Sequence, residues 1–296
     1  MRMKFLPNTL YSDFFRSKNL IETAWHGTTE VTRDLISHLV QKDMMVESDP
    51  LGYACDLAYA EMLKSSRPEY VYKNVLLSKM VFGKHSPSTT SWLYEFRAGN
   101  ARADAVLVNG VATAFEIKTD LDDFSRAQSQ LKAYYSCFDR VVFVVGNDQV
   151  NKALRELPEH VGILRLSNKC QLSEIRSAIA YRDELSSEAM FHLFRKNERL
   201  ALQNRHGIHT DHLPPIEQYS VACEAVSLLP PSIIHNDLVD ALRKRAPALR
   251  KASISNRLPD SLRAAAFGYK MKSSDWALLS SRLREPAFKA LETKVI

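Results

Sequence analysis

Two carboxylates and a lysine lie on neighbouring stretches of β-prone residues in this chain. Asp104 is in the run RADAVLV, and Glu116 and Lys118 end the run ATAFEIK as an ExK triplet. Mg²⁺ prefers oxygen ligands, and a lysine can orient water or offset the charge of a phosphate. Glu116 and Lys118 share one face of their strand because side chains alternate with period 2. The pattern predicts a metal-dependent site for phosphodiester cleavage, with the backbone carbonyl of Ile117 as a third oxygen ligand.

Each of these motifs also has a simpler interpretation. An ExK triplet is common on strands, and Asp104 is close enough to Arg102 in the sequence to form a surface ion pair. Glu116 nevertheless follows apolar residues, and burying an unpaired carboxylate is costly unless a metal offsets its charge. In the predicted helix that follows, Gln130 and Tyr134 are four residues apart and therefore lie on one face.

These motifs resemble a known superfamily. RADAVLV, AFEIK and QLKAY, in this order and spacing, are similar to the PD-(D/E)XK restriction-endonuclease-like nucleases, and the QxxxY element is most similar to the RecB-like and lambda-exonuclease-like branches. Residues 69–146 also resemble a little-characterised family of bacterial and phage nuclease-like proteins. The resemblance implies a Mg²⁺- or Mn²⁺-dependent deoxyribonuclease on a restriction-endonuclease-like fold.

The resemblance also assigns roles to individual residues. It implies that Asp104 and Glu116 bind the metal and that Lys118 positions or activates water. Gln130 and Tyr134 match the helix motif that supports the site or contacts substrate. Glu95, in the preceding predicted strand, resembles an extra acidic metal ligand of some members, for which an exposed strand glutamate is the alternative.

The surrounding pattern predicts an α/β protein with a mixed sheet flanked by helices and a C-terminal α-helical domain. Residues 20–83 are typical of helices with a break near Pro68, and residues 90–185 alternate between strands and helices. In that core we expect a helix opened by Asp122 or Asp123 and a closing helix over residues 173–185. We therefore predict a nuclease-like domain over residues 20–185 and a basic helical domain over residues 186–296.

The hairpin between the two acidic strands makes a stricter test. A two-residue turn at Asn109-Gly110 would pair Val108 with Val111 and place Asp104 and Glu116 on opposite faces of the sheet. A shared metal site therefore requires a register whose paired residue numbers sum to an even number. The most economical arrangement is a three-residue loop that has Gly110 in the left-handed conformation and pairs Leu107 with Val111.

The distribution of charge favours a polyanionic partner. The formal net charge is +6, and residues 186–296 hold 17 Lys and Arg against 11 Asp and Glu, whereas residues 1–185 hold 23 of each. A basic surface binds nucleic acid through counterion release. The run RKRAPALRK predicts phosphate contacts, with a solvated helix end as the alternative, through five cations: Arg243, Lys244, Arg245, Arg250 and Lys251.

Other features restrict the class of protein. No apolar run is long enough to span a bilayer, no signal peptide is apparent, and four widely spaced cysteines without a CxxC pair favour a reduced, cytoplasmic protein. His206, His209 and His212 could ligate a metal, but a polar loop is the better interpretation. We expect a DNA-cleaving enzyme of phage defence, repair or mobile elements; the alternatives are an RNA nuclease and a non-catalytic nucleic-acid-binding or regulatory protein.

Overall fold

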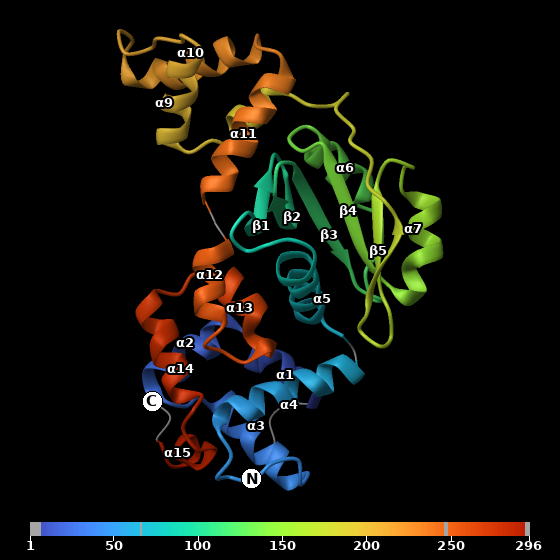
Figure 1. Cartoon of the computed structure of the whole chain (residues 1–296), viewed down its shortest axis with the longest axis vertical. Coiled ribbons are helices and arrows are strands. Elements are labelled where there is room, and N and C mark those ends of the chain that lie inside the picture. Colours follow the sequence, from blue (N-terminus) through green and yellow to red (C-terminus); the bar gives the residue numbers. More distant parts are fainter. Residues whose placement is uncertain (1–6, 66, 246–247, 294–296) are drawn as a thin grey trace. The chain divides into compact units, whose positions relative to one another are not determined.

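The structure is a computed structural model in which residues 7–65, 67–245 and 248–293 are described. The chain divides into two compact units (Figure 1). Unit 1 comprises residues 1–86, 167–172 and 248–296, and unit 2 comprises residues 87–166 and 173–247. This division differs from the predicted boundary after residue 185, because the C-terminal third of the chain contributes to both units.

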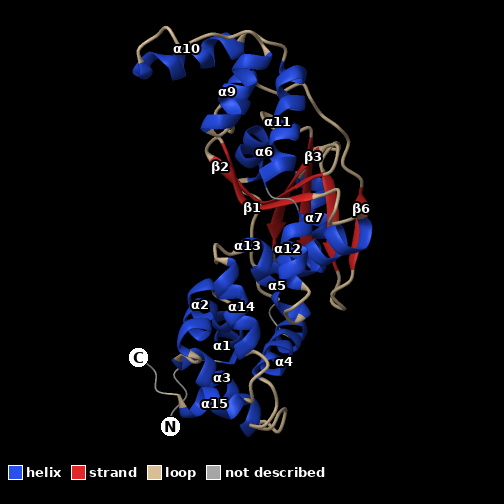
Figure 2. Ribbon diagram, turned by 60° about the vertical axis from the view of Figure 1, so that its left-hand side comes forward, coloured by secondary structure: helices blue, strands red, loops and turns tan. Residues whose placement is uncertain are grey.

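Unit 2 contains a six-stranded mixed sheet in the order β1-β2-β3-β4-β5-β6 (Figure 2). The first three strands form an antiparallel meander, and β3, β4 and β5 run parallel. The predicted mixed sheet flanked by helices is confirmed. Its elements are β1 (Ser91–Ala98), β2 (Ala101–Val108), β3 (Ala112–Lys118), α6 (Ala127–Tyr135), β4 (Arg140–Gly146), η2 (Asn147–Gln149), α7 (Val150–Glu156), β5 (Gly162–Leu166), β6 (Leu172–Arg176), α8 (Ser187–Phe191), α9 (Lys196–Arg205), α10 (Pro215–Ser227) and α11 (Pro231–Arg245).

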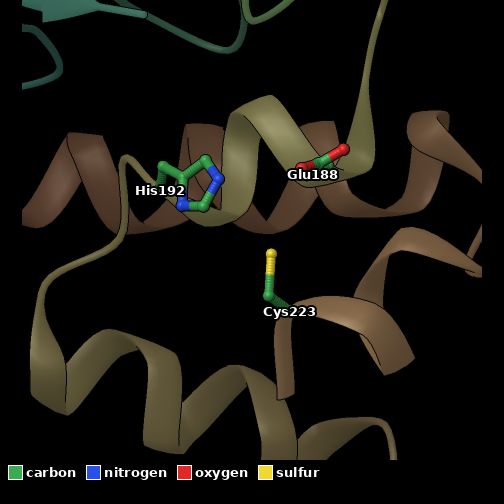
Figure 3. Close-up of side chains that lie close together, drawn as sticks. All are labelled: Glu188, His192 and Cys223. Carbon is green, nitrogen blue, oxygen red and sulfur yellow. The ribbon is translucent and has the colours of Figure 1, made fainter. Parts of the chain in front are cut away.

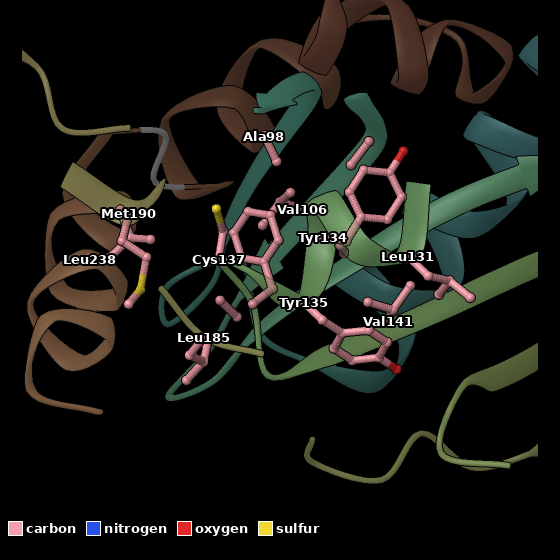
Figure 4. Packing of buried hydrophobic residues seen from close by; sticks show 14 of the residues in the cluster. Ala98, Val106, Leu131, Tyr134, Tyr135, Cys137, Val141, Leu185, Met190 and Leu238 are labelled. Atoms are coloured by element: carbon pink, nitrogen blue, oxygen red, sulfur yellow. The ribbon is translucent and has the colours of Figure 1, made fainter. Parts of the chain in front are cut away.

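Helices α6 and α7 are the crossover connections that parallel strands require. Helix α6 packs on β2 and β4, and α7 packs on β4 and β5. Leu131 and Tyr134 of α6 lie in one apolar cluster with Val106, Val141 and Phe143 of the sheet (Figure 4). Since β4 is buried along almost its whole length, its continuous apolar sequence fits a central strand covered on both faces.

The helices after the sheet belong to the same core. Met190 and Phe191 of α8 and Leu238 and Leu242 of α11 are fully buried in the cluster that contains the sheet residues. Residues 186–247 therefore do not form a separate domain with residues 248–296, and their apolar faces complete unit 2.

Unit 1 is helical. The predicted break near Pro68 is confirmed, because α4 ends at Lys64 and α5 begins at Glu69. The N-terminal helices pack with the C-terminal ones, and Pro50 forms an isolated bridge with Pro286. The elements are α1 (Pro7–Phe14), α2 (Ser17–His26), α3 (Glu30–Gln41), α4 (Leu51–Lys64), α5 (Glu69–Leu77), η1 (Ser78–Lys84), α12 (Ala248–Ser255), η3 (Asp260–Leu262), α13 (Arg263–Gly268), α14 (Ser273–Arg282) and α15 (Ala287–Glu292).

The predicted closing helix over residues 173–185 is wrong. The segment begins as the edge strand β6 and continues without regular structure to residue 186. The Arg176 guanidinium donates hydrogen bonds to the carbonyls of Leu157, Pro158 and Val161, which lie between α7 and β5. These tertiary contacts hold the segment extended against its helical propensity.

The predicted start of α6 at Asp122 or Asp123 is also wrong. The Asp122 carboxylate accepts hydrogen bonds from the backbone and hydroxyl of Thr119, and Asp123 accepts the equivalent bonds from Ser125. Both aspartates therefore stabilise turns before the helix. The helix itself begins only at Ala127.

Candidate active site on the sheet

The β2–β3 hairpin brings the two acidic strands into an even register. Val108 pairs with Ala112, and the loop has three residues, with Gly110 at φ +77°. The expected three-residue loop and left-handed glycine are therefore confirmed, and the two-residue turn is excluded. The expected pairing of Leu107 with Val111 is wrong by two residues, since Leu107 pairs with Thr113.

This register favours a shared site more strongly than the expected one. Ladder pairing continues to Ala105 opposite Phe115, and one further step along the same register sets Asp104 opposite Glu116. Directly opposed residues share a face and have Cβ atoms about 4.5–5.5 Å apart. At this step the Asp104 side chain joins the two strands, because its Oδ2 accepts a hydrogen bond of 2.6 Å from the amide of Ile117.

The Glu116 carboxylate is buried and held from α6. Gln130 Nε2 donates to Oε1 at 2.5 Å, and the Tyr134 hydroxyl donates to Oε2 at 2.7 Å. The two donors are one helical turn apart, as their spacing predicted. Burial, and next the charge of Glu116, raises the pKa of Tyr134, so this residue remains a hydroxyl donor.

Lys118 completes the network on the same face. Its ammonium lies 3.2 Å from Glu116 Oε1 and donates to Gln130 Oε1 at 3.1 Å. Glu116 is 5% exposed and Lys118 is 3% exposed. A buried ion pair requires such additional hydrogen bonds to offset desolvation. Asp104 and Gln130 are half-buried and mark the more accessible side of the site.

Backbone geometry at β1 adds a feature that the sequence did not reveal. Glu95 has φ +51°, a left-handed conformation that is rare within a strand. It falls at the one step that the β1–β2 register omits, opposite Asp104. Its carboxylate pairs with Arg102 at 2.9 Å, and carboxylate oxygens of Glu95 and Asp104 lie within 4.8 Å of each other. Such strain tends to occur at functional sites.

The arrangement of donors fits a hard divalent cation. Asp104 and Glu116 stand one step beyond the last observed pair of β2 and β3, Ala105 with Phe115, and Glu95 places a further carboxylate near Asp104. The amide of Ile117 points toward Asp104, and the carbonyl of a strand residue points to the same edge as its amide. The Ile117 carbonyl is therefore directed toward the same place. Three donors already contact the Glu116 carboxylate, which offers about four lone-pair positions, so this carboxylate keeps one position for a cation.

Sequence reasoning missed one contact of the site. The Tyr134 hydroxyl also lies 3.0 Å from the Arg102 carbonyl, so its single proton is shared between Glu116 and this carbonyl, which connects α6 to β2 beside Asp104. A backbone acceptor has no signature in the sequence. The simpler interpretation of Asp104 was a surface ion pair with Arg102. The salt bridge that Arg102 forms in the structure is with Glu95 instead.

We expect Tyr134→Phe to weaken the site while preserving the fold. The variant loses the hydrogen bonds to Glu116 and to the Arg102 carbonyl. Loss of an outer-shell partner typically lowers metal affinity about 10–100-fold. Titration of Mn²⁺ into the purified variant measures this effect. The matched control is Tyr135→Phe, because the buried Tyr135 hydroxyl has no hydrogen-bond partner among the described residues; equal affinity losses in the two variants would contradict the assigned role.

The cations of the predicted basic cluster differ in their surroundings. Arg243 and Lys244 are exposed on α11. Arg245 is buried in an ion pair with Glu198, and the Lys251 ammonium donates to the Phe267 carbonyl at 2.5 Å. Burial lowers the pKa of Lys251. The side chain of Arg250 lies outside the described ones, and the prediction for it stays untested. Among the described cations of the cluster, Arg243 and Lys244 are the ones exposed for phosphate contacts.

The histidine-rich segment is a loop between α9 and α10, as expected. His206 Nε2 lies 2.6 Å from Asp237 Oδ2 of α11, a carboxylate that also pairs with Arg205. This contact gives His206 a role in packing the loop.

A family model described as bacteriophage P4 protein cII matches residues 62–262, about two thirds of the chain. The chain belongs to the bacteriophage P4 protein cII family. The matched range includes the candidate active site and both exposed cations of α11.

Individual relatives are more distant. Protein cII of Enterobacteria phage P4 is 26% identical over 157 residues, which cover 52% of this chain and 56% of the phage protein. The chain thus matches little more than half the length of this cII relative. Among solved structures, a protein of unknown function from Silicibacter pomeroyi aligns with 40% of this chain and 80% of its own, at 19% identity and a TM-score of 0.28.

Proposed function

We propose that this cII-family protein is a metal-dependent nuclease that hydrolyses phosphodiester bonds in DNA. The observation that carries the proposal is the joint placement of Asp104, Glu116, Lys118, Gln130 and Tyr134 by one hairpin and one helix. A Mg²⁺ or Mn²⁺ ion held by Asp104, Glu116 and the Ile117 carbonyl would supply Lewis acidity and lower the pKa of bound water. Glu95 is a further candidate ligand.

The protein's own residues have separable tasks in this proposal. Gln130 and Tyr134 orient the Glu116 carboxylate, and Asp104 ties β2 to β3 at the same step. Lys118 orients the water that attacks phosphorus, or offsets the negative charge that develops as the P–O bond breaks. Because Lys118 is already fixed by Glu116 and Gln130, little reorganisation is needed when substrate binds.

The charge distribution supports a polyanionic substrate. The excess positive charge does not follow the predicted boundary after residue 185. Residues 186–247 hold 7 Lys and Arg and 7 Asp and Glu, whereas residues 248–296 hold 10 and 4. Unit 1 as a whole has 22 basic against 14 acidic residues, and unit 2 has 18 against 20. A net-positive unit attracts nucleic acid before any specific contact forms.

No helix in the described part of the chain has the length and apolar character needed to cross a bilayer.

The proposal is tested with a panel of substrates. Purified protein is incubated with linear duplex, circular duplex and single-stranded DNA and with RNA, in Mg²⁺ or in EDTA. We expect DNA cleavage in Mg²⁺ alone; cleavage of RNA only would reassign the substrate. Binding without cleavage of any substrate would instead identify a non-catalytic nucleic-acid-binding protein on this fold.

The exposed cations of α11 give a quantitative prediction for DNA binding. Arg243→Ala and Lys244→Ala are each expected to reduce the slope of log affinity against log salt by about 1, as loss of one phosphate contact does. Filter binding of a short duplex at several salt concentrations measures the slope. Lys196→Ala, at an exposed cation of α9, is the matched control. Slopes unchanged from the wild type in both α11 variants would exclude α11 from the DNA-binding surface.

A further inference from the structure

A second group of potential metal ligands lies away from the sheet, between α8 and α10 of unit 2. One ligand atom each from Glu188, His192 and Cys223 falls within 4.8 Å of the others. Glu188 and His192 are four residues apart at the α8 turn, and the Cys223 sulfur points toward that turn from α10 (Figure 3). Glu188 and His192 are exposed, whereas Cys223 is largely buried, so an ion would reach the cysteine past the two exposed side chains.

Tyr219 orients the histidine of this group. Its hydroxyl lies 2.6 Å from His192 Nδ1, which leaves the other ring nitrogen on the side of Glu188 and Cys223. Tyr219 is one helical turn before Cys223 on α10, and His192 is the C-cap of α8, four residues after Glu188. Metal-binding histidines usually have their second nitrogen engaged in this way. The Arg199 guanidinium lies 4.9 Å from the Tyr219 ring centroid and holds the ring in place.

We infer that Glu188, His192 and Cys223 bind a Zn²⁺-class transition-metal ion that joins α8 to α10, with water as the fourth ligand. Nitrogen, thiolate and carboxylate together are the ligand set that zinc prefers over Mg²⁺. Zinc–ligand bonds of about 2.0–2.3 Å place ligand atoms roughly 3.5 Å apart, so atoms that lie within 4.8 Å of one another must approach by at most about 1.3 Å. The exposed side chains of Glu188 and His192 can supply this movement by rotation.

Burial, and then the negative charges of Glu188 and Glu224, raise the pKa of the Cys223 thiol, so the thiol must release its proton when a cation binds. This site differs in kind from the oxygen-rich site on the sheet, so the two should differ in metal preference.

Cobalt substitution tests the inference, because Co²⁺ bound to a thiolate has a sulfur-to-metal charge-transfer band that oxygen-only sites lack. Co²⁺ is titrated into reduced full-length protein, and Zn²⁺ is then added as competitor. We expect a near-ultraviolet charge-transfer band that saturates at one equivalent and disappears with Zn²⁺ but persists with excess Mg²⁺. Cys223→Ser should remove the band, and His192→Gln should weaken cobalt binding at least about tenfold.

The control is Cys170→Ser, which replaces the other partly exposed cysteine and should leave the band unchanged. Circular dichroism establishes that each variant is folded. The inference is overturned if no charge-transfer band forms, or if the band survives in folded Cys223→Ser. Either result leaves the proposed nuclease site untouched, since that site contains no sulfur ligand.

Discussion

Asp104→Asn and Glu116→Gln should each remove one bound Mn²⁺ and lower DNA cleavage at least about 1000-fold. Several kcal/mol of transition-state stabilisation are attributed to such an ion, and each 1.36 kcal/mol corresponds to about a factor of ten in rate. Asp104→Asn is the cleaner change because the asparagine carbonyl can still accept the Ile117 amide. Calorimetric titration with Mn²⁺ gives the number of sites, and single-turnover cleavage gives the rate.

The control for these variants is Asp123→Asn, which neutralises an exposed carboxylate of the loop before α6. It should bind Mn²⁺ and cleave DNA as the wild type does. If folded Asp104→Asn retains both the Mn²⁺ site and wild-type cleavage, Asp104 is not a ligand and the shared site is wrong.

Lys118→Met should abolish cleavage, retain metal binding and destabilise the metal-free protein. Removal of the buried ammonium leaves Glu116 as a buried charge, and breaking such a pair typically costs about 3–5 kcal/mol of unfolding free energy. A bound divalent cation restores the missing positive charge. We therefore expect Mg²⁺ to recover part of the lost stability in the variant and to raise wild-type stability less.

Urea unfolding with and without Mg²⁺ measures this difference. Lys132→Met, at an exposed lysine of α6, should change the unfolding free energy by no more than about 0.5 kcal/mol. If metal-free Lys118→Met is as stable as the metal-free wild type, the buried ion pair between Lys118 and Glu116 does not stabilise the fold as described. If folded Lys118→Met no longer binds metal, the claim that only the carboxylates, and not Lys118, are needed for metal binding is contradicted.

Local patterns predicted the elements that carry the site. Alternation along RADAVLV and ATAFEIK predicted β2 and β3, and the four-residue spacing of Gln130 and Tyr134 predicted their common face on α6. Parity alone required an even hairpin register, and the structure has one. Short-range periodicity determines which side chains can meet, so these features follow from the sequence alone.

Other features depend on contacts that are distant in sequence. The edge strand β6 is held by Arg176 on the carbonyls that follow α7, and helices α8–α11 join the sheet's core. Neither contact has a local signature, so residues 173–185 were predicted as helix and residues 186–247 as part of another domain. The left-handed backbone of Glu95, at the step of β1 that lies opposite Asp104, likewise has no signature in its residue type.

Cleavage of a labelled linear DNA duplex by wild type and Glu116→Gln, purified side by side, tests the central claim most directly. Each protein is assayed in Mg²⁺ and in EDTA, and the variant also controls for contaminating nucleases. We predict product only for the wild type in Mg²⁺, because Glu116 is the carboxylate that Gln130, Tyr134 and Lys118 all contact. Equal cleavage by folded Glu116→Gln would contradict the assignment of this site as the nuclease centre.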